Sequence, residues 1–570
     1  MDTVLPVRRT ERLSGAGRAA VIVGVTGLVA YLTLVPLGFL IYGSFFTPGV
    51  GEQPGIFTVS NYLHAYTDRS SLPVLKNSVV FAAGTAATAF CLGTGLAWIT
   101  ERTDTPLSGL HSALSLVPLI VPGILFSLSW IFLFSPRIGL INLAVRRAFG
   151  LTDPLFNVYS LAGMVWVEGL HWSPLAFLLM TAAFRSMDPA LEESALMSGA
   201  SPRATFFRIT LKLAMPTTLS VMLLLFLRGI ETFEVPAIIG LPVGIHVFTS
   251  KIYLAVKGYP SDLGLAGAYS TLLLAMSLLG IFIHARVTGG ANRFATVTGR
   301  GAVPRRIALG RWRYLTAAVL VGYLGLAVVL PLLVLVWYSL LPYYLQPSVR
   351  ALDLLTVDSY RAVLTLPAVR RAAANTLLLA LASATAVMLL TAVVAWITVR
   401  TRPRGRWLVD QMASLPVIFP GVVMGVALSW AYLRLPVPIY GTLWILLLAY
   451  VTRYLPYGVR ASSSALLRIH TDLEGAAQMS GASWLQLFWR ILFPLMRSGL
   501  VAGWIYVVVV SVRELSSSLL LWSPGNEVLS VVMFDLWQSG HPQEVAALGV
   551  LLAVVLTGAA LVFRRVAPGG

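Results

Sequence analysis

The segment Leu-Glu-Glu-Ser-Ala-Leu-Met-Ser-Gly-Ala-Ser at residues 191–201 returns as Leu-Glu-Gly-Ala-Ala-Gln-Met-Ser-Gly-Ala-Ser at residues 473–483. Eight of the eleven positions are identical. Both copies are polar, whereas most of the surrounding sequence is apolar. We therefore expect a chain of two related halves, which presents the same surface to a soluble partner at two equivalent places.

The composition indicates that this repeat belongs to a membrane protein. Of the 570 residues, 57% are hydrophobic and 11% are charged, and the mean hydropathy is +0.81, whereas soluble domains carry about 25% charged residues. Apolar runs of about 20 residues, long enough to cross a bilayer, recur along the chain. They favour helices over the short alternating strands of a membrane barrel. We predict an all-α polytopic membrane protein in a bilayer and no nucleic-acid partner, because basic loop residues that set orientation explain the net charge of +18.

Twelve membrane spans are predicted, six in each half. They are 19–45, 77–99, 110–134, 159–184, 214–240 and 263–285, then 314–341, 374–397, 409–433, 441–464, 498–522 and 544–563. Arginines gather in alternate loops, as in the linker at 291–313 and in the short loop that contains Arg400, Arg402, Arg404 and Arg406. Because basic residues mark cytoplasmic loops, both termini, the linker and both polar segments are predicted to be cytoplasmic. Exceptions, such as Arg146, Arg147, Arg370 and Arg371, fall in longer loops that are expected outside.

The two halves are parallel repeats, with domains predicted at 1–290 and 314–570 and the cytoplasmic linker between them. The pairs of corresponding residues, 298 positions apart, include Asn77 and Asn375, Pro118 and Pro416, and Pro122 and Pro420. The separation falls to 282 at the polar segments, so the first half has an extra loop at about 135–158. A transport route is expected between the halves. The prolines within apolar spans predict helix kinks or a lining of that route.

Charged residues are also found within the predicted spans. Arg228, Glu231 and Glu234 lie in the fifth span, and Arg513 and Glu514 lie in the eleventh. A charge in hydrocarbon costs roughly 3 kcal/mol or more, so these side chains are expected to face protein or water. Arg228 and Glu231 can pair on one helical face, and Glu231 and Glu514 fall at roughly equivalent places in the repeat. These five residues are candidates for structural ion pairs or for a path or gate.

The residues of the chain provide little for enzyme chemistry. The four lysines are followed by Asn, Leu, Ile and Gly, so the Gly-Lys-Ser/Thr of a phosphate-binding loop does not occur. Glu168 and His171 share a helical face, but we favour a structural role over a metal pair. The single cysteine, Cys91, excludes an intramolecular disulfide and is interpreted as a small buried hydrophobic residue. We expect no catalytic site, no metal site and no cofactor in this chain.

Both polar segments resemble the cytoplasmic loop of ATP-binding-cassette importer permeases. The family pattern is Glu-Ala-Ala, three residues, Gly, nine residues, Ile, then Leu-Pro. The first copy carries Glu192, then Glu193-Ser194-Ala195, Gly199 and Ile209, with Lys212 in place of the proline. The second copy carries Gly475-Ala476-Ala477, Gly481, Ile491 and Pro494, with Glu474 one residue before the family's acidic position.

This resemblance implies that each loop presents a coupling helix to a cytoplasmic ATPase. Two loops imply two ATPase copies, which hold the ATP and magnesium, and a periplasmic or extracellular binding protein that delivers the substrate at a bacterial inner membrane. The stretches 233–240 and 513–521 resemble the fused permeases of ferric-iron importers, so ferric iron is the expected substrate. Thiamine and phosphonate are alternative substrates in such fused permeases.

A proton-coupled secondary transporter is a further interpretation. Glu231, Glu234 and Glu514 could relay protons within the membrane. The polar repeat argues against this class, because a secondary carrier has no ATPase to dock.

Overall fold

The fold is given by a computed structural model, which describes residues 7–47, 55–186, 194–195, 197–205, 208–209, 211–289, 306–401 and 405–566. Within these ranges the regular elements are helices, and two isolated β-bridges accompany them, in agreement with the predicted all-α class. Six helices are long and apolar enough to cross a membrane, or up to ten spans if each of four bent helix pairs counts as one. The six continuous helices coincide in place with predicted spans.

The main helices repeat in both halves. The first half contains α1 (Val7–Gly43), α3 (Ser71–Arg102), α5 (Gly123–Phe134), α7 (Leu161–Ser186), α10 (Leu211–Glu231) and α12 (Leu263–Gly289). The second half contains α13 (Trp312–Leu324), η6 (Gly325–Val329), α14 (Leu330–Ser339), α17 (Pro367–Ala395), η7 (Trp396–Arg400), α19 (Gly421–Tyr432), α20 (Leu443–Leu467), α24 (Arg497–Val512) and α27 (Pro542–Val566).

Shorter helices fill the connections. Those of the first half are α2 (Ser60–Thr67), α4 (Ser108–Leu114), η1 (Val117–Leu119), α6 (Leu140–Phe149), α9 (Pro202–Thr205), η3 (Pro236–Gly240), η4 (Leu241–Val243) and α11 (Phe248–Lys257). Those of the second half are α15 (Val349–Leu352), α16 (Asp358–Thr365), α18 (Arg406–Ser414), η8 (Leu415–Ile418), α21 (Asp472–Met479), α22 (Trp484–Leu487), η9 (Phe488–Leu492), α23 (Phe493–Leu495), α25 (Ser518–Leu521) and α26 (Leu529–Gln538).

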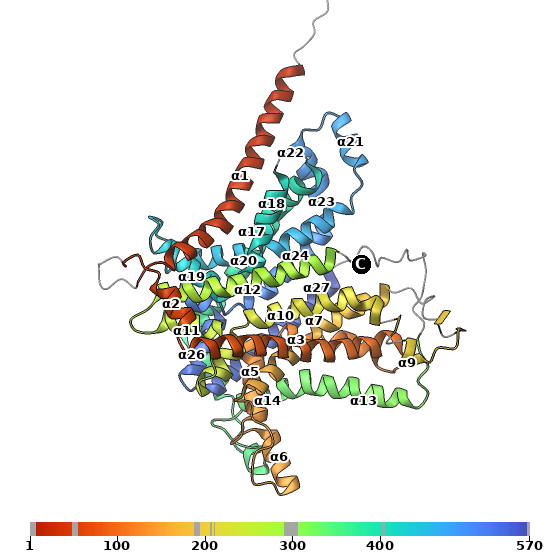
Figure 1. Cartoon of the computed structure of the whole chain (residues 1–570), viewed down its shortest axis with the longest axis vertical. Helices are drawn as coiled ribbons and strands as arrows, with labels where there is room; N and C mark the ends of the chain where they lie inside the picture. The colour runs from red at the N-terminus through yellow and green to blue at the C-terminus, as the bar shows by residue number, and fades with distance from the viewer. Residues whose placement is uncertain are drawn as a thin grey trace, which may run out of the picture.

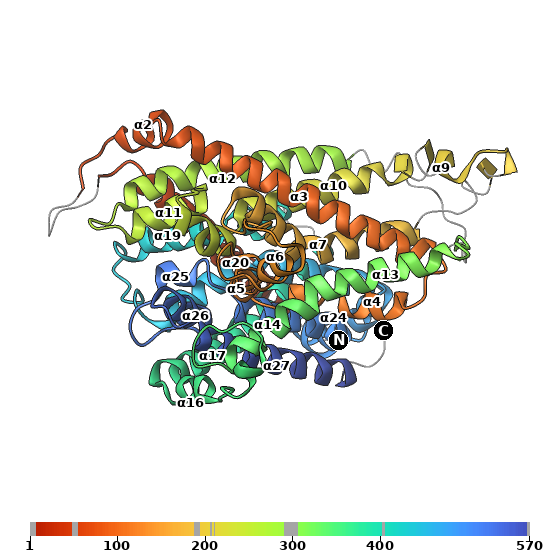
Figure 2. The same cartoon turned by 90° about the horizontal axis from the view of Figure 1, so that it is seen from below.

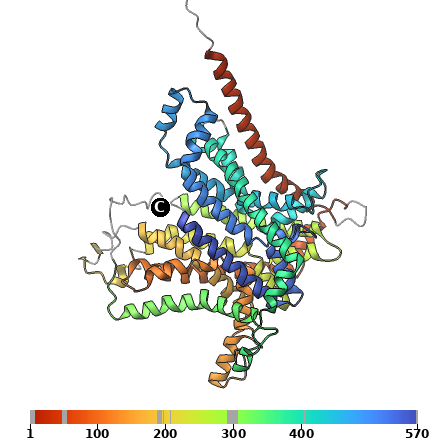
Figure 3. The ribbon, with the colours of Figure 1, turned by 180° about the vertical axis from the view of Figure 1, so that it is seen from behind.

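The two halves exchange their first helices. Helix α1 packs on α18 and α19 of the second half, and the hydroxyl oxygens of Tyr31 and Tyr432 lie 2.6 Å apart. Helix α13 packs on α4 of the first half, where the Tyr323 hydroxyl lies 2.9 Å from that of Ser173 in α7. Figure 1 and the view from behind in Figure 3 show α1, in red, beside the helices of the second half, and Figure 2 shows α13 beside α3. The halves are therefore interlocked.

The spans predicted at 110–134 and 409–433 are broken sharply, where a continuous or kinked helix was expected. The two segments of each span meet at 102° in the first half and at 110° in the second. The breaks lie at Pro122 and Pro420, which stand in extended conformation immediately before α5 and α19. Proline lacks a backbone donor and disfavours helical geometry in the residue before it, so the helix stops there and restarts in a new direction.

The spans predicted at 214–240 and 498–522 end early, because α10 stops at Glu231 and α24 stops at Val512. Glu234, Arg513 and Glu514 thus lie beyond these two helices. Their positions correct their assignment to the helical spans. A break frees backbone carbonyls, which need donors when buried.

Hydroxyls of later helices supply donors at both breaks. Thr249 of α11 donates to the Thr232 carbonyl at 2.8 Å, and Ser530 of α26 donates to the Glu514 carbonyl at 2.5 Å. Because the contact is the same in both halves, the counterpart of Glu514 is Thr232, one residue after the expected Glu231.

The matched asparagines also occupy equivalent places. The Asn77 amide donates to the His246 carbonyl at 3.2 Å, and the Asn375 amide donates to the Glu527 carbonyl at 2.9 Å. Each contact links a long helix, α3 or α17, to the segment just before α11 or α26. The hydroxyl of the residue after each asparagine accepts a hydrogen bond from a backbone amide. Ser78 accepts from the Phe248 amide at 3.0 Å, and Thr376 accepts from the Leu529 amide at 2.9 Å. The repeat therefore extends to individual side-chain contacts.

Two surface features complete the fold. The extra loop of the first half contains α6, which projects from the bundle at the bottom of Figure 1. Its base is held by Asn142, whose buried amide donates to the carbonyls of Phe134, Ser135 and Phe156. Cys91 is exposed on α3, so the interpretation of this residue as a buried hydrophobic one was wrong. In an apolar spanning helix, exposure means contact with lipid, which suits a cysteine as well as a protein core does.

Candidate functional site

The second polar segment folds into two short helices joined by a glycine turn. Helix α21 ends in a Schellman motif, in which the Ala482 amide donates to the Ala477 carbonyl and the Gly481 amide donates to the Gln478 carbonyl, both at 3.0 Å. Gly481 has a φ of +80°, a conformation that glycine adopts without a Cβ clash. Helix α22 follows, and Ser483 caps its first turn. Residues 472–487 therefore form a knob of helix, turn and helix, called the second knob below.

The described part of the first polar segment has the same turn. Ser194, Ala195 and Met197 are helical, and Gly199 has a φ of +82°. The Ala200 amide donates to the Ala195 carbonyl at 3.0 Å, which matches the contact between Ala482 and Ala477. Glu192 and Glu193 lie outside the described residues. The carboxylates predicted for this loop thus have no described position, whereas the turn that shapes the knob does.

Each knob exposes one methionine. The exposed fraction is 90% for Met197 and 91% for Met479, and these two residues are counterparts in the repeat. Ala477 faces inward and is buried, whereas Ala476 is exposed. Ile209 and Ile491 are half-buried and Pro494 is exposed. An exposed flexible thioether is a common contact residue of protein-binding surfaces, so these methionines mark the two outer surfaces.

Glu474 forms a contact within the chain. Its Oε1 lies 2.7 Å from Nε of Arg400, and the exposed fractions of the two side chains are 14% and 11%. Sequence reasoning had assigned Arg400 only to the basic loop that sets orientation. The ion pair places the carboxylate against η7 at the base of the knob.

The charged cluster of the first half contains the predicted ion pair. Arg228 Nη1 lies 3.2 Å from Glu231 Oε2. The Arg228 guanidinium also donates to the hydroxyl of Tyr457 at 2.5 Å and lies over the Trp172 ring, 5.6 Å from its centroid. Tyr457 belongs to α20, so Arg228 joins the two halves near the middle of the bundle.

The charged cluster of the second half encloses Glu514. This buried carboxylate pairs with Arg453 of α20 at 3.0 Å, accepts a hydrogen bond from Tyr454 at 3.0 Å and accepts another from the Ser517 hydroxyl at 2.9 Å. Arg453 was missed in the sequence, although it is a charged residue within the predicted span 441–464. The criterion applied to spans five and eleven would have found it.

A buried carboxylate lies at the break just after α10 in the first half and at the break just after α24 in the second half. The two carboxylates come from different elements. In the first half Glu168 of α7 accepts hydrogen bonds from Thr232 at 2.5 Å and from Trp172 at 2.6 Å. In the second half Glu514 itself stands at the place of Thr232. Glu168 therefore has a structural role, and no group of three or more potential metal ligands occurs among the residues that the structure describes.

The proline breaks meet the charged clusters. The Arg513 guanidinium of the second half donates to the Leu119 carbonyl of the first half, just before the break at Pro122. Glu234 lies beside Gly123, where an added Cβ would be 3.4 Å away. At the equivalent Gly421 an added Cβ would lie 1.7 Å from Arg453 Nη1. Pro122 and Pro420 thus place backbone breaks beside the charged clusters, and Arg513 joins the first of these breaks to the second half.

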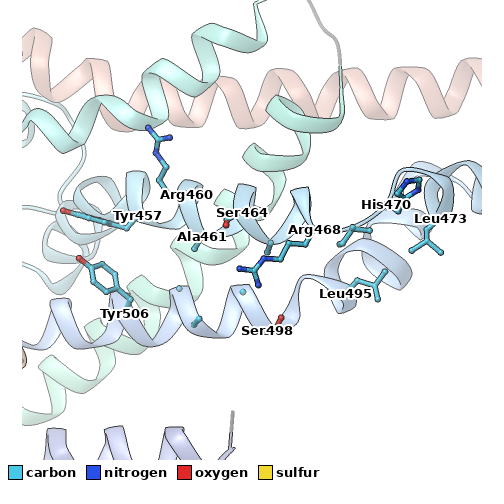
Figure 4. Close-up of a pocket in the computed structure, with 15 residues that line it drawn as sticks. Tyr457, Arg460, Ala461, Ser464, Arg468, His470, Leu473, Leu495, Ser498 and Tyr506 are labelled. Atoms are coloured by element: carbon cyan, nitrogen blue, oxygen red, sulfur yellow. The ribbon is translucent and has the colours of Figure 1, made fainter. Parts of the chain in front are cut away.

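A groove of about 760 Å³ runs between α20 and α24. Tyr457 and Tyr506 lie at one end, with ring centroids 5.2 Å apart, and His470 and Leu473 lie at the other end, next to the knob. Figure 4 shows Arg468 between the two helices and Arg460 directed away from α24. The groove links the cross-half contact of Tyr457 to the second polar segment, and its residues were missed because they lie far apart in sequence.

The comparisons with known proteins agree with the internal repeat. Residues 89–289 and 387–568 both match the family described as "Binding-protein-dependent transport system inner membrane component". A ferric transport system permease protein of Actinobacillus pleuropneumoniae is 25% identical over 495 residues, covering 86% of this chain and 70% of that protein. A putative ferric transport system permease protein of Haemophilus influenzae is 24% identical over 480 residues, covering 83% and 74%.

More distant similarities were also found. A putative 2-aminoethylphosphonate transport system permease protein of Salmonella paratyphi A is 29% identical over 163 residues, covering 28% of this chain and 61% of that protein. A chain from a crystal structure of a bacterial ABC transporter involved in alginate import is 15% identical, with a TM-score of 0.40, covering 51% of this chain and 100% of that chain.

Proposed function

Because the chain belongs to the family of binding-protein-dependent transport system inner membrane components, we propose that it is the permease of an importer that brings ferric iron into the cytoplasm and is driven by two separate ATPase subunits. Members of this family are membrane subunits of transporters and are not enzymes. The ATP and magnesium are held by the ATPases, and a soluble binding protein outside the membrane delivers the iron.

The observation that carries this proposal is the double occurrence of the knob. Gly199 and Gly481 form the same turn, and each turn follows an exposed methionine. Two equivalent knobs on one chain suit two copies of one partner, as a dimer of ATPases provides. The knobs, the linker at 291–313 and both termini then lie on the cytoplasmic side.

The five charged residues at the breaks are proposed to serve the path between the halves. Two of the five, Arg228 and Arg513, make contacts that cross from one half to the other, to Tyr457 and to Leu119. A rocking motion that separates the halves must break these contacts, so we assign the gate to them. Glu231 and Glu234 lie beside the gate. Glu514 is enclosed by its own half, and we assign it the role of an anchor for Arg453.

Iron is proposed because two relatives that span most of the chain are named ferric transport permeases. The phosphonate relative covers a much smaller part of the chain, so phosphonate, like thiamine, is a less favoured substrate. A proton-coupled carrier is disfavoured as well, because a secondary carrier has no ATPase to dock at the two knobs formed around Gly199 and Gly481.

Reconstitution tests the proposal. The chain is placed in liposomes with a candidate ATPase and a candidate binding protein from the same organism, and uptake of radioactive ferric iron is measured with ATP inside the vesicles. We expect uptake that needs ATP, the ATPase and the binding protein. Parallel assays with thiamine and with 2-aminoethylphosphonate identify the substrate. Iron uptake by the chain alone under a proton gradient would contradict the proposal.

A further inference from the structure

The second knob is held on the ends of two long helices by one arginine. Arg400 is the last residue of η7, which continues α17. Its Nε lies 2.7 Å from Glu474 of α21. Its Nη2 donates to the Leu466 carbonyl at 3.0 Å and also to the Ile469 carbonyl, at the end of α20. One guanidinium therefore joins α17, α20 and the knob.

An aromatic contact lies on the same element. Trp396, which begins η7, is buried and stacks on Trp484 of α22, with ring centroids 5.3 Å apart and an interplanar angle of 24°. Phe488 lies 6.4 Å from Trp396, and the Arg18 guanidinium lies over the same indole at 5.2 Å. Both short segments of the knob, α21 and α22, are thus attached to η7 by different chemistry.

We infer that Arg400 is a positioning residue that clamps the second knob to α17 and α20, so that a displacement of the knob by its partner moves these helices with it. The inference rests on the proposed function for the identity of that partner. A guanidinium with several donors in a fixed plane suits this role, because it can hold a carboxylate and two carbonyls at once.

The clamp explains what the displaced carboxylate does. The family's acidic position is taken by Gly475, and Glu474 stands one residue earlier, where it meets Arg400. Glu474 therefore contacts η7 on the inner side of the knob, whereas Met479 is exposed on its outer side. The indole stack is specific to the second half, because the counterpart of Trp484 in the first polar segment is Pro202, which has no aromatic ring.

Hydrogen exchange of the full chain alone tests the clamp. Arg400→Gln and Glu474→Gln are each expected to speed exchange of the amides in 472–482 by about tenfold, because a charge-assisted contact that limits local opening is lost. Arg400→Lys, which keeps a positive charge and hydrogen-bond donors at this place, is expected to recover part of the protection. Arg406→Gln is the matched control, because Arg406 is an exposed arginine of the next helix that contacts only the Thr401 carbonyl among the described hydrogen bonds. Unchanged exchange in both Arg400→Gln and Glu474→Gln would overturn the clamp.

Transport per ATP hydrolysed tests the consequence. In the reconstituted importer we expect this ratio to fall several-fold in Arg400→Gln and Glu474→Gln while the ATPase stays bound, and to recover in part in Arg400→Lys. A wild-type ratio in Arg400→Gln would overturn the inference even if exchange were faster. If the unmodified chain moves no substrate with an ATPase, the proposed function fails, and the exchange experiment alone decides whether the clamp exists.

Discussion

Arg513, at the break after α24 in the second half, donates a hydrogen bond to the backbone carbonyl of Leu119, at the break before α5 in the first half. Each break exposes polar backbone in the middle of an apolar bundle, and a carbonyl there must be paired within the protein or with water. The second half thus supplies a donor for a carbonyl at the break of the first half. The same contact is one of those that join the two halves.

Removing this donor should weaken the bundle. We expect Arg513→Met, which keeps the length of the side chain and loses the guanidinium, to lower stability by about 1–3 kcal/mol because a carbonyl loses its charged partner. The measurement is the apparent unfolding midpoint in detergent. Arg497→Met, at the exposed start of α24, is the control and should leave the midpoint unchanged. An equal effect of both variants would contradict a special role for Arg513.

The two break glycines should respond differently to the same change. An added Cβ at Gly421 would lie 1.7 Å from Arg453 Nη1, whereas at Gly123 the nearest atom is 3.4 Å away in Glu234. Arg453 cannot move aside without leaving Glu514, to which it is bound at 3.0 Å. We expect Gly421→Ala to cost about 2 kcal/mol and Gly123→Ala less than about 1 kcal/mol. Comparison of their thermal unfolding midpoints checks this, and similar midpoints would refute it.

The parts of the fold that depend on local chemistry were predictable from the sequence. The turn at Gly481 needs a residue that tolerates positive φ and a helix that ends just before it, and both are visible in the chain. The pairing of Asn77 with Asn375 followed from the constant separation of the repeats. A repeat constrains every position at once, so a few matched residues were enough to locate equivalent contacts.

The parts that depend on distant partners were not predictable in the same way. The apolar run continues past Glu231, and the helix ends there because Thr249, on a later helix, supplies a donor for the freed carbonyl. The exchange of α1 and α13 between halves has no local signal. The enrichment of arginine in cytoplasmic loops predicts the location of Arg400. It gives no information on the partner of Arg400, which is Glu474.

The glycine turn of the second knob allows a matched test within one polar segment. Gly481 has a φ of +80°, whereas Gly475 lies inside α21 with nothing within 4 Å of an added Cβ. We expect Gly481→Ala to loosen the knob by about 1–2 kcal/mol, because an alanine there is strained. Gly475→Ala should stabilise α21 by up to about 1 kcal/mol. Hydrogen exchange of 472–482 reports both effects, and faster exchange in Gly475→Ala would show that the helix is not limited by propensity.

The exposed methionines are expected to carry the contact with the ATPases. Met197 and Met479 are at least nine-tenths exposed, so a glutamate in either place should leave the fold intact. In an apolar docking pocket that glutamate would be an unpaired buried charge and should weaken binding by at least about tenfold. Copurification of ATPase with the chain measures this.

The stoichiometry of the retained ATPase separates this prediction from a general loss of affinity. Two independent docking sites predict that Met197→Glu and Met479→Glu each remove one ATPase from the complex and that the double variant removes both. Met479→Leu, which keeps the apolar surface, is the control and should retain both copies. If both single variants bind two copies normally, the knobs are not docked through their methionines, because a charge placed at a residue 91% exposed acts only through a partner that covers it.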